Sequence, residues 1–231
     1  MAASSALRLI LGSSSASRRQ ILSEMGYQFT LLSADIDEKA IRKEKPEELV
    51  VALAHAKADA ILEKMQNNGM MKEIVDSQDT TLLITADQLL HNVYEYNSVF
   101  TNYQAIEMGL RTIVQAAFEL HESRVVVHDG VIREKPSTPE EAREFIKGYS
   151  ESHAATIGSV LVTNVKTGVR RDGWDKAEIE EGNVFYVAGG LLVEHPLTSP
   201  LVEAIVGTID SVMGLPKALT ETLIKESFSE P

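Results

Sequence analysis

The chain has 231 residues, a formal net charge of −12, 44% hydrophobic and 24% charged residues, and no cysteine. Its length suits one large α/β domain or two closely joined lobes. The acidic balance argues against nucleic-acid binding, and the absence of cysteine excludes disulfides and thiolate metal sites. Neither a membrane-spanning run nor a secretory signal is recognisable, so we expect no membrane partner and a cytoplasmic location.

The first predicted unit is a short strand, a turn of small residues and a helix. Residues 7–11 are apolar apart from Arg8, residues 12–15 are Gly-Ser-Ser-Ser, and Ser15 is suited to cap the helix that follows. Free backbone N–H groups and the helix dipole make such a turn an anion site. Arg18 and Arg19 gain nothing from the positive end of a dipole, so a bound phosphate would explain them. The alternative is a surface helix with two solvated arginines.

Two later segments carry further candidate ligands. Residues 35–38 form an acidic loop, which is either a solvated turn or the source of a carboxylate that holds a hard cation such as Mg²⁺. Residues 46–65 predict a strong helix, with Lys57 on or beside its apolar stripe. A lysine at that place either extends to water or binds phosphate in a cleft.

Asp87 is the best catalytic candidate in the chain. Residues 81–85, Thr-Leu-Leu-Ile-Thr, are typical of a buried strand, and residues 86–88 would close it. An acid at the C-terminal end of a central strand lies where open α/β sheets bind ligands. The alternative is an aspartate that caps a helix or a turn.

Residues 89–124 do not continue that strand pattern and predict an amphipathic helix with one face to bury. Strand character resumes at residues 125–127, and residues 128–130 predict a hairpin turn into a return strand at 131–136. Residues 154–165 alternate and predict a long strand.

Several motifs together resemble the Maf family, the nucleoside triphosphate pyrophosphatases also called septum-formation inhibitor-like proteins. No single motif is decisive, but all occur in family order and cover most of residues 7–88 and 125–231. They are Ser13-Ser14-Ser15-Ala16-Ser17-Arg18-Arg19, Asp37-Glu38, Ala56-Lys57-Ala58, Thr85-Ala86-Asp87-Gln88, Lys135-Pro136 and the run from Gly207 to Pro216.

The resemblance implies an α/β fold in which helices flank a mixed, bent central sheet and two lobes surround a cleft. It also implies a single Maf-like domain over residues 1–231, with an atypical helical insert at about 89–124. The implied reaction is hydrolysis of a nucleoside triphosphate between the α and β phosphates, with Mg²⁺ or another divalent cation such as Mn²⁺.

The same resemblance implies roles for particular residues. Asp87 matches the family's catalytic proton acceptor, and Glu38 matches a cleft carboxylate that would hold the metal together with Asp87. The residues that match the phosphate-binding set are Ser13, Arg18, Arg19, Lys57 and Lys135. Cationic side chains from separate elements could neutralise a triphosphate, which agrees with these roles.

Three positions favour the branch of the family that handles 7-methyl-GTP over the dTTP/UTP branch. They are Ser17, which with Ala16 separates the motif serine from the arginine pair, Gln88 after the catalytic aspartate, and Glu194. A carboxylate such as that of Glu194 can accept hydrogen bonds from the N1–H and amino group of guanine.

Two departures from the family pattern suggest an alternative function. The insert lies directly behind Asp87, and the region after Ile179 is short, as if a strand end and a helix were missing. Either Leu89-Leu90 replaces the start of the lost strand, or residues 125–127 pair only with the return strand and Asp87 is held from its N-terminal side alone. We favour the second arrangement, which predicts low activity. The alternative is therefore a catalytically impaired nucleotide-binding or protein-interaction module, whose insert favours self-association as a homodimer.

Overall fold

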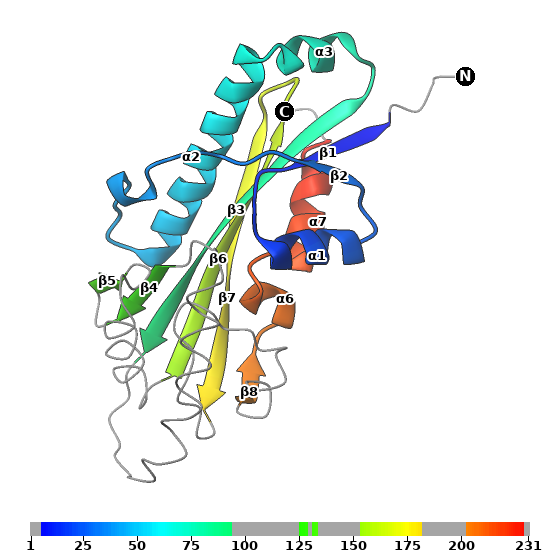
Figure 1. Ribbon diagram of the computed structural model, residues 1–231. Coiled ribbons are helices and arrows are strands. Elements are labelled where there is room, and N and C mark those ends of the chain that lie inside the picture. The colour runs from blue at the N-terminus through cyan, green and yellow to red at the C-terminus, as the bar shows by residue number, and fades with distance from the viewer. Residues whose placement is uncertain (1–5, 94–124, 129–130, 134–152, 182–201, 229–231) are drawn as a thin grey trace. The chain divides into compact units, whose positions relative to one another are not determined.

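The computed structural model describes residues 6–93, 125–128, 131–133, 153–181 and 202–228 (Figure 1). Among these residues, no helix combines the length and the apolar character needed to cross a membrane. The elements in chain order are β1 (Leu7–Leu11), α1 (Ala16–Glu24), β2 (Phe29–Leu31), the 3-10 helix η1 (Glu38–Ala40), α2 (Pro46–Asn67), α3 (Met70–Asp76), β3 (Thr80–Val93), β4 (Val125–His128), β5 (Val131–Arg133), β6 (His153–Asn164), β7 (Arg170–Glu181), β8 (Val202–Val206), α6 (Ile209–Val212) and α7 (Lys217–Glu226).

These strands form one mixed sheet. Its order is β2-β1-β3-β6-β7-β8, with β4 beside β3 and β5 beside β4. Strand β1 pairs in parallel with β2 and β3, and β3 pairs in parallel with β4, whereas β4–β5 and β7–β8 are antiparallel. The predicted α/β architecture, a mixed sheet flanked by helices, is therefore confirmed.

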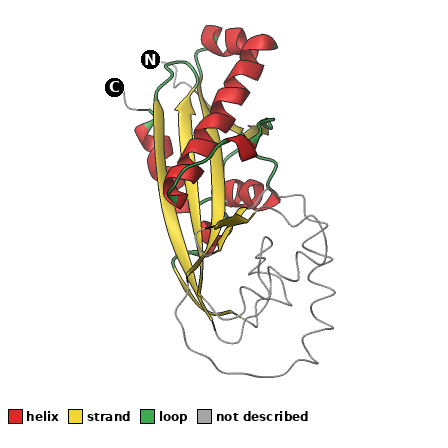
Figure 2. Ribbon diagram, turned by 90° about the vertical axis from the view of Figure 1, so that its left-hand side faces the viewer, coloured by secondary structure: helices red, strands yellow, loops and turns green. Residues whose placement is uncertain are grey.

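Helices cover both faces of the central strands (Figures 1 and 2). Successive residues of a strand point to opposite faces, so Leu9 and Leu11 join one apolar core with α1 and α7, while Ile10 joins a second core with α2 and α3. Strand β3 divides in the same way, with Leu82 in the first core and Leu83 in the second. Burial on both faces explains why these strands are nearly continuous apolar runs.

The chain divides into two compact units. One comprises Met1–Asp87, Gly158–Asp175 and Met213–Pro231, and the other comprises Gln88–Ile157 and Lys176–Val212. Both apolar cores belong to the first unit.

Strand β3 is longer than the sequence pattern predicts. The prediction that it closes at residues 86–88 is wrong, because it runs on to Val93. Its residues Leu89–His91 pair in parallel with Val125–Val127. The arrangement that we favoured, in which the strand is held only before Asp87, is therefore also wrong.

The hairpin prediction is confirmed, since Val127 pairs antiparallel with Ile132. Strand β7 continues to Glu181 and pairs with β8, so the strand end that the sequence suggested was missing is present. The helical part of the predicted insert, residues 94–124, and the segment 182–201 lie outside the described residues.

Candidate active site

The turn after β1 forms as the sequence predicts. Ser15 caps α1, because its Oγ accepts a hydrogen bond from the backbone N–H of Arg18 at 3.3 Å. The Oγ of Ser13 accepts a bond from the backbone N–H of Ser15 at 3.2 Å. Gly12 is required at the start of the turn, because a Cβ there would lie 2.6 Å from side-chain carbons of Ile61 and Thr85.

The two arginines of α1 have different environments. Arg18 is 8% exposed, whereas Arg19 is exposed to solvent. The Nε of Arg18 donates to the carbonyl of Gly214 at 2.9 Å, and its guanidinium also donates to Ser13 Oγ at 3.3 Å. Adjacent residues of a helix point in directions about 100° apart, so one buries its charge and the other does not. The structure therefore brings Arg18, and not Arg19, to Ser13.

Lys57 lies on the buried side of α2. The residue is 9% exposed, and its Nζ contacts Asp87 Oδ1 at 2.8 Å and Glu38 Oε1 at 2.9 Å. Of the two possibilities that the sequence left open for this lysine, extension into water is thus excluded. The ammonium group joins two carboxylates that lie on separate elements, η1 and β3.

Asp87 lies inside β3, not at its end, and is 2% exposed. Burial raises the pKa of this carboxyl above its ordinary value, while the positive charges of Lys57 and Arg18 oppose that shift. The charge of Glu38 adds to the rise. Positive charge from α1 and α2 therefore acts on one buried acid.

Gln88 and Ser17 are both buried, and their predicted roles in base specificity remain predictions. The side-chain amide of Gln88 donates to the backbone carbonyls of Ser211 and Val212, each at 2.8 Å. Ser17 is 9% exposed within α1. Lys135 and Glu194 lie outside the described residues, so their predicted roles in binding phosphate and base remain predictions.

Sequence reasoning did not assign a role in the site to two backbone carbonyls. Gly214 holds Arg18 across 196 residues of sequence, and Ala54 accepts a hydrogen bond from the hydroxyl of Thr85 at 2.8 Å. Backbone acceptors have no sequence pattern of their own. Strand alternation does place Thr85 on the same face as Asp87, and this pattern in the sequence could have indicated that Thr85 lies near the site.

The donor set for a divalent ion is small. Among the described residues, no group of three or more histidines and acids could hold a metal by itself. Glu38 and Asp87 nevertheless present carboxylate oxygens to the same ammonium group. Mg²⁺ is often bound by one or two carboxylates plus the phosphates of a substrate, so this pair fits a metal that arrives with a nucleotide.

Comparison with known proteins decides the family. The family model described as Maf-like protein matches residues 8–227. The chain belongs to the Maf family. It is 34% identical to a 7-methyl-GTP pyrophosphatase of Dictyostelium discoideum over 94% of this chain and 96% of that protein. It is also 28% identical to a dTTP/UTP pyrophosphatase of Psychrobacter cryohalolentis over 94% of this chain and 96% of that protein.

A second 7-methyl-GTP pyrophosphatase is also similar to this chain. The Maf chain is 29% identical to a 7-methyl-GTP pyrophosphatase of Rhizobium meliloti, over 88% of this chain and 98% of that protein. The resemblance inferred from short motifs is thus confirmed over nearly the full length. Both kinds of named relative are nucleotide pyrophosphatases, so their names alone do not decide between the two kinds of base.

Proposed function

We propose that this chain is a nucleoside triphosphate pyrophosphatase, which hydrolyses the bond between the α and β phosphates to give a nucleoside monophosphate and pyrophosphate. The observation that carries the proposal is the contact of Lys57 with both Asp87 and Glu38 in a chain of the Maf family. Buried charges are costly to keep, and a cluster of them around one acid is typical of an active site.

In the proposed reaction Asp87 accepts the proton of the attacking water. Without a metal, burial raises the pKa of this carboxyl and makes it a stronger base than an ordinary aspartate, and a bound divalent ion would oppose that rise. Lys57 and Arg18 stabilise the negative charge that builds up on the phosphate oxygens. Ser13 keeps the guanidinium of Arg18 directed at the turn, through the hydrogen bond at 3.3 Å.

The proposed metal is Mg²⁺, with Mn²⁺ as a substitute, held by Glu38 and Asp87. When bound, a divalent ion polarises the phosphoryl group and neutralises part of its charge. Lys57 holds both carboxylates in the structure, so it keeps the metal ligands together until the nucleotide brings its own oxygens.

The proposed substrate is 7-methyl-GTP, within a broader class of modified or noncanonical nucleotides. Support comes from Gln88 after the catalytic aspartate and from the name of the Dictyostelium relative. Glu194 is the proposed acceptor for the guanine edge. A cytoplasmic location and a homodimer complete the proposal as expectations from the sequence.

A direct test measures pyrophosphate release with Mg²⁺ across 7-methyl-GTP, GTP, UTP and dTTP. We expect kcat/KM to be highest for 7-methyl-GTP, and Asp87→Asn is the control for contaminating activity. Faster hydrolysis of UTP or dTTP would reject the substrate but keep the reaction. Absence of pyrophosphate release from every nucleotide would reject the reaction itself.

The impaired-module alternative loses its main support, because β3 continues past Asp87 and pairs with β4. Joining Gln88 directly to Val125 would remove residues 89–93 from that strand, and we expect it to lower activity. If the insert instead disrupts the site, its removal would restore the strand, and the joined chain would be more active. Higher kcat/KM in the joined chain would therefore support the alternative again.

A further inference from the structure

One buried hydrogen bond joins the two elements that carry the central ion pair. The hydroxyl of Thr85 donates to the carbonyl of Ala54 at 2.8 Å, and Thr85 is 0% exposed. Thr85 lies two residues before Asp87 on the same face of β3, and Ala54 lies one helical turn before Lys57 on α2. The bond therefore lies one helical turn from Lys57 along α2 and two residues from Asp87 along β3.

The methyl group of the same threonine packs against the predicted anion-binding turn. A Cβ on Gly12 would lie 2.6 Å from Thr85 Cγ2, and the N–H of Gly12 donates to the carbonyl of Ile84 at 2.7 Å. Gly12 directly precedes Ser13. Thr85 thus contacts the helix of Lys57 with its oxygen and the turn of Ser13 with its carbon.

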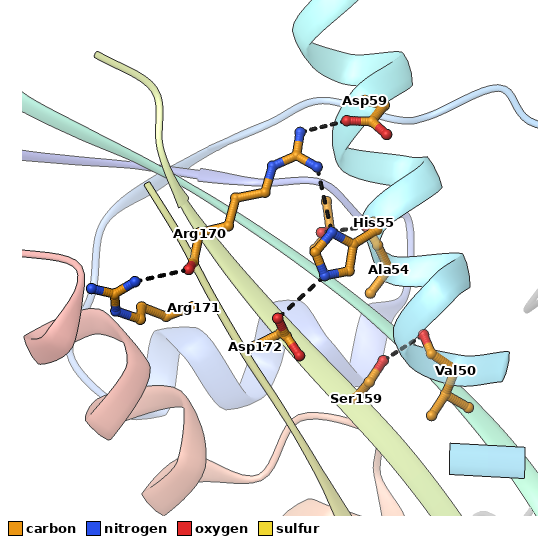
Figure 3. A network of polar contacts seen from close by, with 9 residues as sticks. Val50, Ala54, His55, Asp59, Ser159, Arg170, Arg171 and Asp172 are labelled. Carbon is orange, nitrogen blue, oxygen red and sulfur yellow. Dashed lines mark hydrogen bonds and ion pairs between the residues drawn. The ribbon is translucent and has the colours of Figure 1, made fainter. Parts of the chain in front are cut away.

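A second hydroxyl holds α2 one turn earlier. Ser159 of β6 donates to the carbonyl of Val50 at 2.7 Å, and Ser159 is 0% exposed (Figure 3). Val50 and Ala54 are four residues apart, so the two accepting carbonyls lie on the same side of α2. Hydroxyl groups from two strands therefore hold the helix at two successive points along its axis.

We propose that Thr85 is a positioning residue, whose hydroxyl sets the placement of α2 on the sheet and thereby holds Lys57 Nζ between Asp87 and Glu38, with Ser159 as the second anchor. The kinetic part of this inference rests on the proposed function. The geometric part concerns only the placement of Lys57 and stands without it.

The substitution Thr85→Val tests the hydrogen bond between Thr85 and the carbonyl of Ala54 directly. A hydroxyl approaches a carbonyl oxygen to 2.8 Å only because a proton lies between them, whereas a carbon and an oxygen keep about 3.3–3.6 Å apart. Thr85→Val keeps the shape of the side chain but forces α2 outward by about half an ångström or turns the side chain away. Thr85→Ser keeps the hydroxyl and removes only the methyl group.

The chain offers two matched controls. Thr81 lies on the same strand and the same face, and its buried hydroxyl has no partner among the described residues, so Thr81→Val removes no hydrogen bond. Thr220 of α7 donates to the carbonyl of Pro216 at 2.7 Å and is 0% exposed. Thr220→Val therefore loses a comparable buried bond away from Lys57.

The kinetic test measures kcat and KM per folded protein, with the folded fraction taken from circular dichroism at the assay temperature. Since an error of about 1 Å in a reacting group can cost on the order of 100-fold, we expect Thr85→Val to lower kcat between about 10-fold and 100-fold. We expect kcat to fall by a larger factor than KM rises, because the displaced ammonium group acts most strongly on the charge that builds up in the transition state. Thr85→Ser should recover most of kcat, and both controls should match the parent chain.

A kcat for Thr85→Val equal to that of Thr81→Val would overturn the proposal. If Thr85→Val does not fold, Ser159→Ala takes its place. We then expect kcat to fall in Ser159→Ala and to stay unchanged in Thr220→Val, and an unchanged kcat in Ser159→Ala would overturn the proposal.

Crystal structures of Thr85→Val and Thr81→Val add a measurement that does not depend on activity. We expect a longer distance from Lys57 Nζ to Asp87 Oδ1 only in Thr85→Val, and an unchanged distance rejects the inference. Absence of pyrophosphate release from the parent chain rejects the proposed function instead.

Discussion

Helix α2 carries two networks of charged side chains that differ in burial. On one side, Lys57 contacts Asp87 at 2.8 Å and Glu38 at 2.9 Å, and Asp87 is only 2% exposed. On the other side, His55 Nε2 contacts Asp172 at 3.3 Å, and Arg170 pairs with Asp59, whose side chain is 66% exposed (Figure 3). Both networks join α2 to strands of the sheet.

The comparison shows that the distance between two charges does not by itself determine how much their contact contributes to stability. Water screens the outer network, and exposed ion pairs contribute about 0–1 kcal/mol. In the inner network Lys57 and Asp87 are buried while the side chain of Glu38 is 24% exposed, so the Lys57–Asp87 pair is the one most shielded from water, and removal of one partner costs about 3–5 kcal/mol in buried pairs. The outer network joins α2 to the sheet, and the inner network is the one that we propose to bind a charged ligand.

The largest expected effect comes from the acid at the centre of the inner network. Asp87→Asn keeps the size of the side chain and removes the charge needed to accept a proton or bind a metal. We expect turnover to fall about 100-fold or more, as for loss of a general base. Pyrophosphate release measures it, and activity near that of the parent chain would remove Asp87 from the mechanism.

The next largest effect concerns the buried cations. Arg18→Ala and Lys57→Ala should each lower kcat/KM for triphosphates by about 10-fold to 100-fold, because one stabilising charge is lost from a site that excludes water. Arg19→Ala is the control, since Arg19 has the same charge but is exposed. Equal effects of the two arginine variants would show that burial does not separate their roles.

A smaller effect is expected on stability, and its sign follows from the raised pKa of Asp87. A carboxyl whose pKa is higher in the folded than in the unfolded state contributes stability below its unfolded pKa and loses that contribution as the pH rises through the folded pKa. The free energy of unfolding of the metal-free parent chain should therefore fall relative to that of Asp87→Asn as the pH rises from acid to neutral. Denaturant unfolding of both proteins at several pH values tests this, and a difference that moves the other way with pH would contradict it.

The smallest effect is expected in the outer network. Arg170→Ala removes the contacts with Asp59 and His55, and we expect a loss of about 1 kcal/mol or less in the free energy of unfolding. We expect kcat to stay unchanged, because no member of this network touches Asp87 or Lys57 in the described part of the chain. A fall in kcat comparable to that of Lys57→Ala would mean that the two networks are coupled through α2.

The sequence by itself determined the local elements around the site. The cap at Ser15, the start of α2 at Pro46 and the β4–β5 hairpin were predicted correctly, because caps, helical periodicity and strand alternation involve residues only a few positions apart. The ordered motifs also identified the family, and the resemblance predicts Asp87 and Lys57 as residues of the site.

The tertiary structure decided which of these residues meet. Asp87 was expected at a strand end and lies inside β3, because the pairing of Leu89–His91 with β4 extends the strand beyond the apolar run. Lys57 contacts Asp87 across 30 residues of sequence, and Arg18 contacts Gly214 across 196. Periodicity shows which face of a helix is buried, but sheet order and helix docking determine which carboxylate or carbonyl a buried cation contacts.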